Sequence, residues 1–186
     1  YLVVCVDGRG TGFRGKKFAS VVYKNLGKYE TEDQIAAARY VASLPYVDAS
    51  KIGIFGWSFG GYETLMAMTA PGNPYAAGIA VAPVTDWRLY DSVYTERFML
   101  TPQQNSVGYD ASSTLGRIKN LKGNLLIVSD NVHIANTFEF VSEATSQNKI
   151  LDMMVYPNKN HFINGCETRL ALYTKLLDYF NRNLKK

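Results

Sequence analysis

The chain has 186 residues, which is enough for one domain with a substantial buried core. Hydrophobic residues make up 47% of it and no low-complexity run interrupts them, so an intrinsically disordered chain is excluded. The net charge of +4 is small and the lysines and arginines are scattered, which gives no indication of nucleic-acid binding. No stretch approaches the roughly 18 consecutive apolar residues that a membrane span requires.

The first residues predict a fully buried β-strand over residues 1–6, Tyr-Leu-Val-Val-Cys-Val. Because this strand begins without a start methionine or a signal peptide, we expect the chain to be part of a longer protein. Its two cysteines, Cys5 and Cys166, indicate neither a disulfide framework nor a cellular compartment.

Apolar runs and amphipathic stretches then alternate along the whole chain. Further strands are predicted at residues 51–56, 78–81, 124–128 and 149–156. A capping box of Thr31 and Gln34 predicts the start of one helix. Further helices are predicted over residues 59–69, 136–146 and 167–181. The last helix carries Leu170, Tyr173, Leu177 and Phe180 on one face. This alternation predicts a single α/β domain, with a mostly parallel sheet covered by helices on both faces.

A serine follows one of these strands in a pattern that carries chemistry. Gly56-Trp57-Ser58-Phe59-Gly60 matches G-x-S-x-G, with a buried strand before it and a helix after it. In this context the tight turn raises the serine hydroxyl above the carboxyl ends of the strands. The amide of Phe59, at the helix N-terminus, is then directed at an oxyanion that forms on the substrate. The pattern therefore predicts the nucleophile elbow of an α/β-hydrolase, with Ser58 as the nucleophile.

A serine hydroxyl needs a base, and the chain has only two histidines. His161 follows the last predicted strand, where a hydrolase places its base, whereas His133 is predicted to be a capping or packing residue. The order of nucleophile, acid and base along the chain places a carboxylate after residues 124–128, and Asp130 lies there. We therefore predict Ser58, Asp130 and His161 as the catalytic residues.

A cofactor or a metal ion is not expected. Two histidines about 28 positions apart, without H-x-x-x-H or C-x-x-C spacing, give no recognisable metal site. The glycine-rich segment Gly10-Thr-Gly12-Phe-Arg-Gly15 matches G-x-G-x-x-G and leaves a nicotinamide-binding oxidoreductase as a remote alternative. No second strand with an acidic end follows about 20 residues later, as a dinucleotide site requires.

Several longer motifs resemble the prolyl oligopeptidase family. They are Asp7-Gly-Arg-Gly-Thr-Gly, Gly56-Trp-Ser-Phe-Gly-Gly-Tyr62, Val81-Ala-Pro-Val-Thr-Asp-Trp87 and Tyr90-Asp-Ser-Val-Tyr94-Thr-Glu-Arg97. The last of them is most similar to the dipeptidyl peptidase IV branch, in particular to its bacterial members. The resemblance covers nearly the whole chain and implies an α/β-hydrolase fold. It also implies a serine peptidase that releases N-terminal dipeptides with proline or alanine in second position.

The resemblance further implies a substrate site. A pocket for the proline ring would be lined by Phe59, Val84, Trp87, Tyr90, Tyr94 and Val132, and Asn131 would bind a substrate carbonyl. A flat ring fits between aromatic walls. The tyrosine hydroxyls of such a pocket remain free to bond polar neighbours. By the same resemblance, the substrate is a peptide with N-terminal X-Pro or X-Ala, the location is periplasmic or secreted, and the full-length protein forms a homodimer.

The chain also departs from the family pattern. About four residues of the acid loop are absent before Ser129-Asp130-Asn131-Val132-His133, so Ser129 aligns with the usual catalytic aspartate. Phe162 stands where a glycine is usual. The first strands of the hydrolase domain, the loop with an oxyanion-hole tyrosine and the β-propeller are expected to lie outside residues 1–186. Two readings remain open: Asp130 replaces the usual acid, or the chain is a non-catalytic hydrolase remnant. The distance between the Asp130 carboxylate and the His161 ring distinguishes these two readings.

Overall fold

The computed structural model describes residues 1–185, which fold around one parallel sheet. Its strands are β1 (Gly53–Trp57), β2 (Ala77–Val81), β3 (Asn124–Ser129) and β4 (Asp152–Val155), in the spatial order β1-β2-β3-β4. All three neighbouring pairs are parallel. The four strands overlap the predicted runs from residue 51 onward, so the predicted parallel α/β sheet is confirmed.

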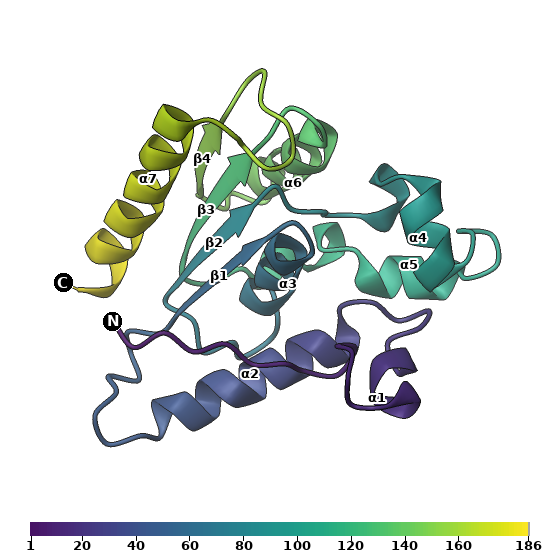
Figure 1. Cartoon of the computed structure of the whole chain (residues 1–186), viewed down its shortest axis with the longest axis horizontal. Helices are drawn as coiled ribbons and strands as arrows, with labels where there is room; N and C mark the ends of the chain where they lie inside the picture. The colour runs from purple at the N-terminus through teal and green to yellow at the C-terminus, as the bar shows by residue number, and fades with distance from the viewer. Residues whose placement is uncertain (186) are drawn as a thin grey trace.

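Helices cover both faces of this sheet (Figure 1). In chain order they are α1 (Lys16–Ser20), α2 (Lys28–Ala42), α3 (Phe59–Met68), α4 (Ser92–Met99), α5 (Ser106–Ser112), α6 (Ile134–Ser146) and α7 (Cys166–Leu184), with 3₁₀ turns η1 (Trp87–Leu89) and η2 (Leu115–Asn120). The long helix α7 covers one face, α3 and α6 cover the other, and α2 packs on the outside of α3.

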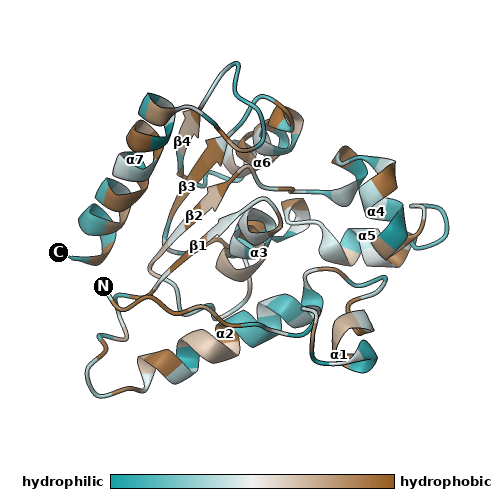
Figure 2. Ribbon diagram, in the orientation of Figure 1, coloured by the Kyte–Doolittle hydropathy of each residue, from teal (hydrophilic) through white to brown (hydrophobic). Residues whose placement is uncertain are grey.

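The core follows the alternation of side chains along the central strands. On β2 and β3, Ile79 and Val128 face the α7 side, whereas Ala80 and Ile127 face α3 and α6. All of these side chains are buried, as expected for parallel strands covered on both faces. Figure 2 shows the hydrophobic colour on β3, inside the sheet.

The predicted strand over residues 1–6 is wrong. These residues are extended but not part of a sheet, and most of their side chains are exposed. They run alongside α2, where Gln34 Nε2 donates to the Val6 carbonyl at 3.1 Å (Figure 1). A strand requires a neighbour to satisfy its backbone groups, and no described strand lies beside this segment.

Two helix predictions are also corrected. Helix α2 begins at Lys28 rather than after Thr31, and the Glu30 carboxylate accepts a hydrogen bond from the Gly27 amide at 3.1 Å. On α7 the predicted apolar face is wrong for Leu170, Tyr173 and Leu177, which are exposed, whereas Phe180 is half-buried and packs against the core. The buried positions are the neighbouring ones, Leu172, Leu176, Tyr179 and Leu184.

Within residues 1–185, no helix combines the length and the apolar character that crossing a membrane would need.

Candidate active site

The turn between β1 and α3 places Ser58 at the carboxyl end of the sheet. Ser58 has φ 60° and ψ −114°, a strained backbone conformation for a residue with a side chain. A Cβ atom on Gly56 would lie 1.9 Å from the Gly60 carbonyl oxygen, so the turn closes only with glycine at position 56. Phe59 is the first residue of α3, and its amide has no partner within the helix.

Three predicted residues from distant parts of the chain meet at this turn. His161 Nε2 lies 2.7 Å from Ser58 Oγ, and His161 Nδ1 lies 2.8 Å from Asp130 Oδ2. Each distance is that of a strong hydrogen bond, so a proton can pass from the Ser58 hydroxyl to the imidazole. Asp130 follows β3 and His161 follows β4, which brings both residues to the edge of the sheet where Ser58 lies.

The Asp130 carboxylate is fully engaged. Its Oδ1 accepts hydrogen bonds from the Val132 and His133 amides, both at 3.0 Å. Burial favours the neutral acid, but the hydrogen bonds from His161 and these two amides outweigh it and hold the pKa of Asp130 below its usual value. Asp130 is therefore charged at neutral pH and favours an Nδ1–H tautomer of His161.

The loop that carries His161 is fixed from two sides. Trp57 Nε1 donates to the His161 carbonyl at 3.0 Å, and Arg169 donates to the Phe162 carbonyl at 3.1 Å. The Phe162 ring is 62% exposed and lies 5.9 Å from the imidazole, measured between ring centroids. With Phe162 next to it, His161 therefore still lies within hydrogen-bond distance of Ser58.

The predicted pocket residues gather around one tryptophan. Trp87 stacks with Tyr94 at 5.8 Å and contacts Phe59 and Tyr90, both at 5.9 Å. Trp87 and Val84 are buried beneath this cluster, whereas Tyr90 and Tyr94 are half-buried and reach its surface. Burial raises the pKa of both tyrosines, so they remain neutral. The side chains of Asn131 and Val132, next to Asp130, are exposed.

His133 lies at the N-cap position of α6, without a side-chain capping bond, and its ring packs between Tyr90 and His161. This agrees with the predicted packing role, but the sequence did not indicate that the residue lies in the site. Its ring lies 4.6 Å from Tyr90 and 5.6 Å from His161 between centroids. Burial lowers the pKa of His133, although Asp130 opposes this, so His133 is neutral at pH 7. Only the short spacing between Asp130 and His133 could have indicated a shared location.

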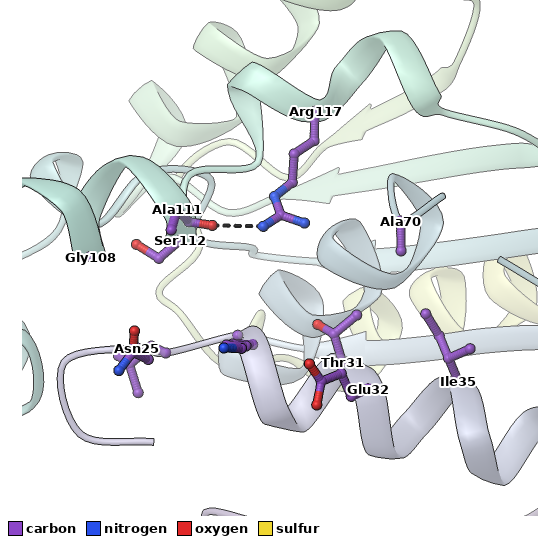
Figure 3. A pocket seen from close by; sticks show the side chains of 12 residues that line it. Asn25, Thr31, Glu32, Ile35, Ala70, Gly108, Ala111, Ser112 and Arg117 are labelled. Atoms are coloured by element: carbon purple, nitrogen blue, oxygen red, sulfur yellow. Dashed lines mark hydrogen bonds between the residues drawn. The ribbon is translucent and has the colours of Figure 1, made fainter. Parts of the chain in front are cut away.

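A separate cavity of about 470 Å³ lies between α2 and α5 (Figure 3). Figure 3 shows Arg117, which donates to the Ala111 carbonyl, facing Thr31 and Glu32 of α2. None of its lining residues belongs to the predicted site. Among residues 1–185 no cluster of histidine, cysteine or acidic side chains suits a metal ion.

The glycine-rich segment also lacks the context of a dinucleotide site in the described chain. It follows irregular backbone rather than a strand and precedes α1, which has only 5 residues. Arg9 instead binds Asp33 of α2 at 2.7 Å, and it lies 4.6 Å from the centre of the Tyr29 ring.

Comparisons with known proteins agree with this arrangement. The chain is 53% identical to the chain in the crystal structure of Porphyromonas gingivalis dipeptidyl peptidase 4, with a TM-score of 0.94 over 97% of this chain and 26% of that one. It is 44% identical to dipeptidyl aminopeptidase B of Saccharomyces cerevisiae, over 97% of this chain and 23% of the relative. The protein of Ajellomyces capsulatus named "Probable dipeptidyl-aminopeptidase B" is 45% identical over 96% of this chain and 20% of its own length.

The chain thus spans about a fifth to a quarter of the length of these relatives. The sequence profile described as "Prolyl oligopeptidase family" matches residues 1–186, the whole chain. With an α/β-hydrolase sheet and a match of this extent, the chain belongs to the prolyl oligopeptidase family of serine peptidases.

Proposed function

We propose that the protein is a serine peptidase of the dipeptidyl peptidase IV type, with Ser58, His161 and Asp130 as its catalytic residues. The observation that carries the proposal is the continuous hydrogen-bonded path from Asp130 through His161 to Ser58, with both distances below 2.9 Å. It favours the enzyme over a non-catalytic remnant, which would leave Asp130 directed into solvent.

The proposed reaction has two steps. In the first, Ser58 Oγ attacks the carbonyl carbon of the scissile bond while His161 Nε2 takes the hydroxyl proton. The Phe59 amide stabilises the oxyanion, and His161 then gives the proton to the leaving amine. In the second step His161 takes a proton from a water molecule, which attacks the carbonyl carbon of the acyl-enzyme. The bond between this carbon and Ser58 Oγ then breaks, His161 gives the proton to Ser58 Oγ, and the dipeptide leaves. Asp130 stabilises the imidazolium that forms in each step.

The proposed substrates are peptides that begin with X-Pro or X-Ala. The pyrrolidine ring would contact Tyr90 and Tyr94, supported from below by Trp87 and Val84, and Val132 would close the pocket. Asn131 would donate to a substrate carbonyl. A periplasmic or secreted location and a homodimer of the longer protein belong to the same proposal, on the ground of family membership.

The test is release of dipeptides, measured by mass spectrometry. The protein is incubated with Gly-Pro-Leu-Leu, with its N-acetylated form and with Gly-Gly-Leu-Leu. We expect free Gly-Pro from the first peptide, much less Gly-Gly from the last, and no product with Ser58→Ala.

Each other outcome has a distinct meaning. Cleavage of the acetylated peptide at the same rate would contradict the dipeptidyl type and indicate an endopeptidase. No cleavage of any peptide by the folded protein would favour the remnant.

A further inference from the structure

Asn136, in the first turn of α6, has all of its side-chain polar atoms bound to a single loop. Its Oδ1 accepts from the Thr85 amide at 2.8 Å, from the Thr85 hydroxyl at 3.2 Å and from the Asp86 amide at 3.4 Å. Its Nδ2 donates to the Leu89 carbonyl at 3.2 Å. The same Thr85 hydroxyl proton is shared with the Asn136 carbonyl, whose oxygen lies 2.9 Å from the hydroxyl oxygen. Asn136 and Thr85 are both fully buried.

These bonds connect two segments with different tasks in the proposed enzyme. The loop at residues 82–90 carries Val84, Trp87 and Tyr90 of the proposed proline pocket. Asn136 lies only six residues after Asp130, and its amide donates to the His133 carbonyl at 3.0 Å. Asn136 therefore joins the proline pocket to the segment that holds the acid.

The chemistry of the position requires an amide. The loop presents two amide donors and a hydroxyl to one side of the Asn136 side chain, and a carbonyl acceptor to the other. Asparagine has an acceptor and a donor at this distance from the backbone, whereas aspartate would set a carboxylate oxygen against the Leu89 carbonyl. An apolar residue would leave buried groups unpaired.

We infer that Asn136 is a positioning residue, which fixes the position of the proline pocket relative to Ser58 and His161. Through this position it sets the preference for proline over alanine. The inference rests on the proposed function. The proline ring uses the walls of the pocket more than the alanine methyl group does. A displaced pocket therefore costs X-Pro substrates more than X-Ala substrates, while the Asp130–His161–Ser58 path stays intact.

The test compares two activities in Asn136→Asp and in Thr85→Val. Thr85→Val keeps the size of the side chain and removes only the hydrogen bonds of the hydroxyl. It therefore still tests the inference if Asn136→Asp does not fold. The first activity is the rate at which a fluorophosphonate labels Ser58. The second is the ratio of kcat/KM for Gly-Pro and Gly-Ala peptides, with KM and kcat measured separately.

We expect labelling within about threefold of the parent, because the probe does not use the pocket. The Gly-Pro kcat/KM should fall by about 10- to 100-fold, as misplacement of a substrate by about 1 Å can do, mainly through KM. The Pro/Ala ratio should fall towards one, and Thr85→Ser should restore it. Asn73→Asp is the matched control, since Asn73 makes similar bonds to Met68 and Tyr75 in the turn before β2.

An unchanged Pro/Ala ratio in an active variant would overturn the inference and leave the proposed function standing. Labelling and peptide cleavage that fall in equal proportion would also overturn it, because the role would then be structural only. Failure of the unsubstituted protein to cleave either peptide is the distinct result that rejects the proposed function, and the inference with it.

Discussion

The Asp130 carboxylate uses both of its oxygens, one for the backbone of its own loop and one for His161. Two amides bind Oδ1, so the side chain has one orientation, in which Oδ2 lies 2.8 Å from His161 Nδ1. The loop after β3 thus presents a carboxylate to the imidazole. Ser129, the residue before Asp130, is buried and donates to the Asp130 carbonyl at 3.0 Å.

Replacing Asp130 by asparagine should therefore stop the proposed reaction without unfolding the protein. In Asp130→Asn the amide favours the wrong tautomer of His161, and the imidazolium loses its counter-charge. We expect kcat/KM for Gly-Pro substrates to fall by about 10³- to 10⁴-fold, as in other serine hydrolases. The control is Asp178→Asn, which alters an exposed ion pair with Arg182 on α7. A loss of less than about tenfold would contradict the role of Asp130.

At the scale of single residues, the sequence predicted which side chains meet and missed one contact. Ser58, Asp130 and His161 were found because the elbow motif and the chain order restrict where each can lie. The place of His133 between Tyr90 and His161 depends on how the loop after β3 folds, and no pattern in the sequence specifies that. The roles of these residues stay predictions until they are substituted.

At the scale of elements, the turn between β1 and α3 contains both glycines of the G-x-S-x-G motif, Gly56 and Gly60, but only Gly56 lacks space for a side chain. A Cβ atom on Gly56 would lie 1.9 Å from the Gly60 carbonyl oxygen, whereas one on Gly60 would meet no atom within 4 Å in residues 1–185 apart from its chain neighbours and its own helix backbone. Gly56→Ala should lower the free energy of unfolding by about 3 kcal/mol or more, because the backbone must move. Gly60→Ala should not lower it. Denaturant unfolding of both variants is the measurement, and equal effects would contradict the geometry of the turn.

The contact between α2 and α3 contains a buried acid. Glu63 is 9% exposed, and its Oε2 accepts from the Thr31 hydroxyl at 3.4 Å, whereas its buried Oε1 has no hydrogen-bond partner among residues 1–185. Burial, together with nearby Glu30, raises the pKa of Glu63 well above its usual value. Burial also raises the pKa of Glu30 to about 7.

This acid should make stability depend on pH. Glu63 is protonated in the folded state but ionises near its ordinary pKa once the chain unfolds. Its contribution is therefore fully present at acid pH and is lost as pH rises towards the folded pKa. In Glu63→Gln this loss is removed. We expect the unfolding free energy of the parent, relative to the variant, to fall by at least about 1 kcal/mol between about pH 5 and pH 8.

Chemical denaturation at several pH values gives this difference. Glu139→Gln, at an exposed position of α6, is the control and should show no such slope. Parallel pH profiles of the parent and Glu63→Gln would contradict the account.

At the scale of the whole molecule, the sequence predicted the four strands of the sheet correctly, but it did not predict the structure of residues 1–6 or which face of α7 is buried. Strands β1 to β4 were found because buried apolar runs alternate with helices. Residues 1–6 have the same composition, but a strand also needs a neighbour, which composition does not reveal. On α7 two apolar stripes lie side by side, and only packing shows that Leu172 and Leu176 face the sheet while Leu170 and Leu177 face outward.

The measurement that tests the central claim most directly is covalent labelling of Ser58. The protein is treated with a fluorophosphonate, and the adduct is located by mass spectrometry, with Ser58→Ala and His161→Ala as controls. The account predicts one adduct per chain at Ser58, absent from the first variant and strongly reduced in the second. A folded protein that stays unlabelled, or one labelled equally well without His161, would contradict an activated nucleophile at this site.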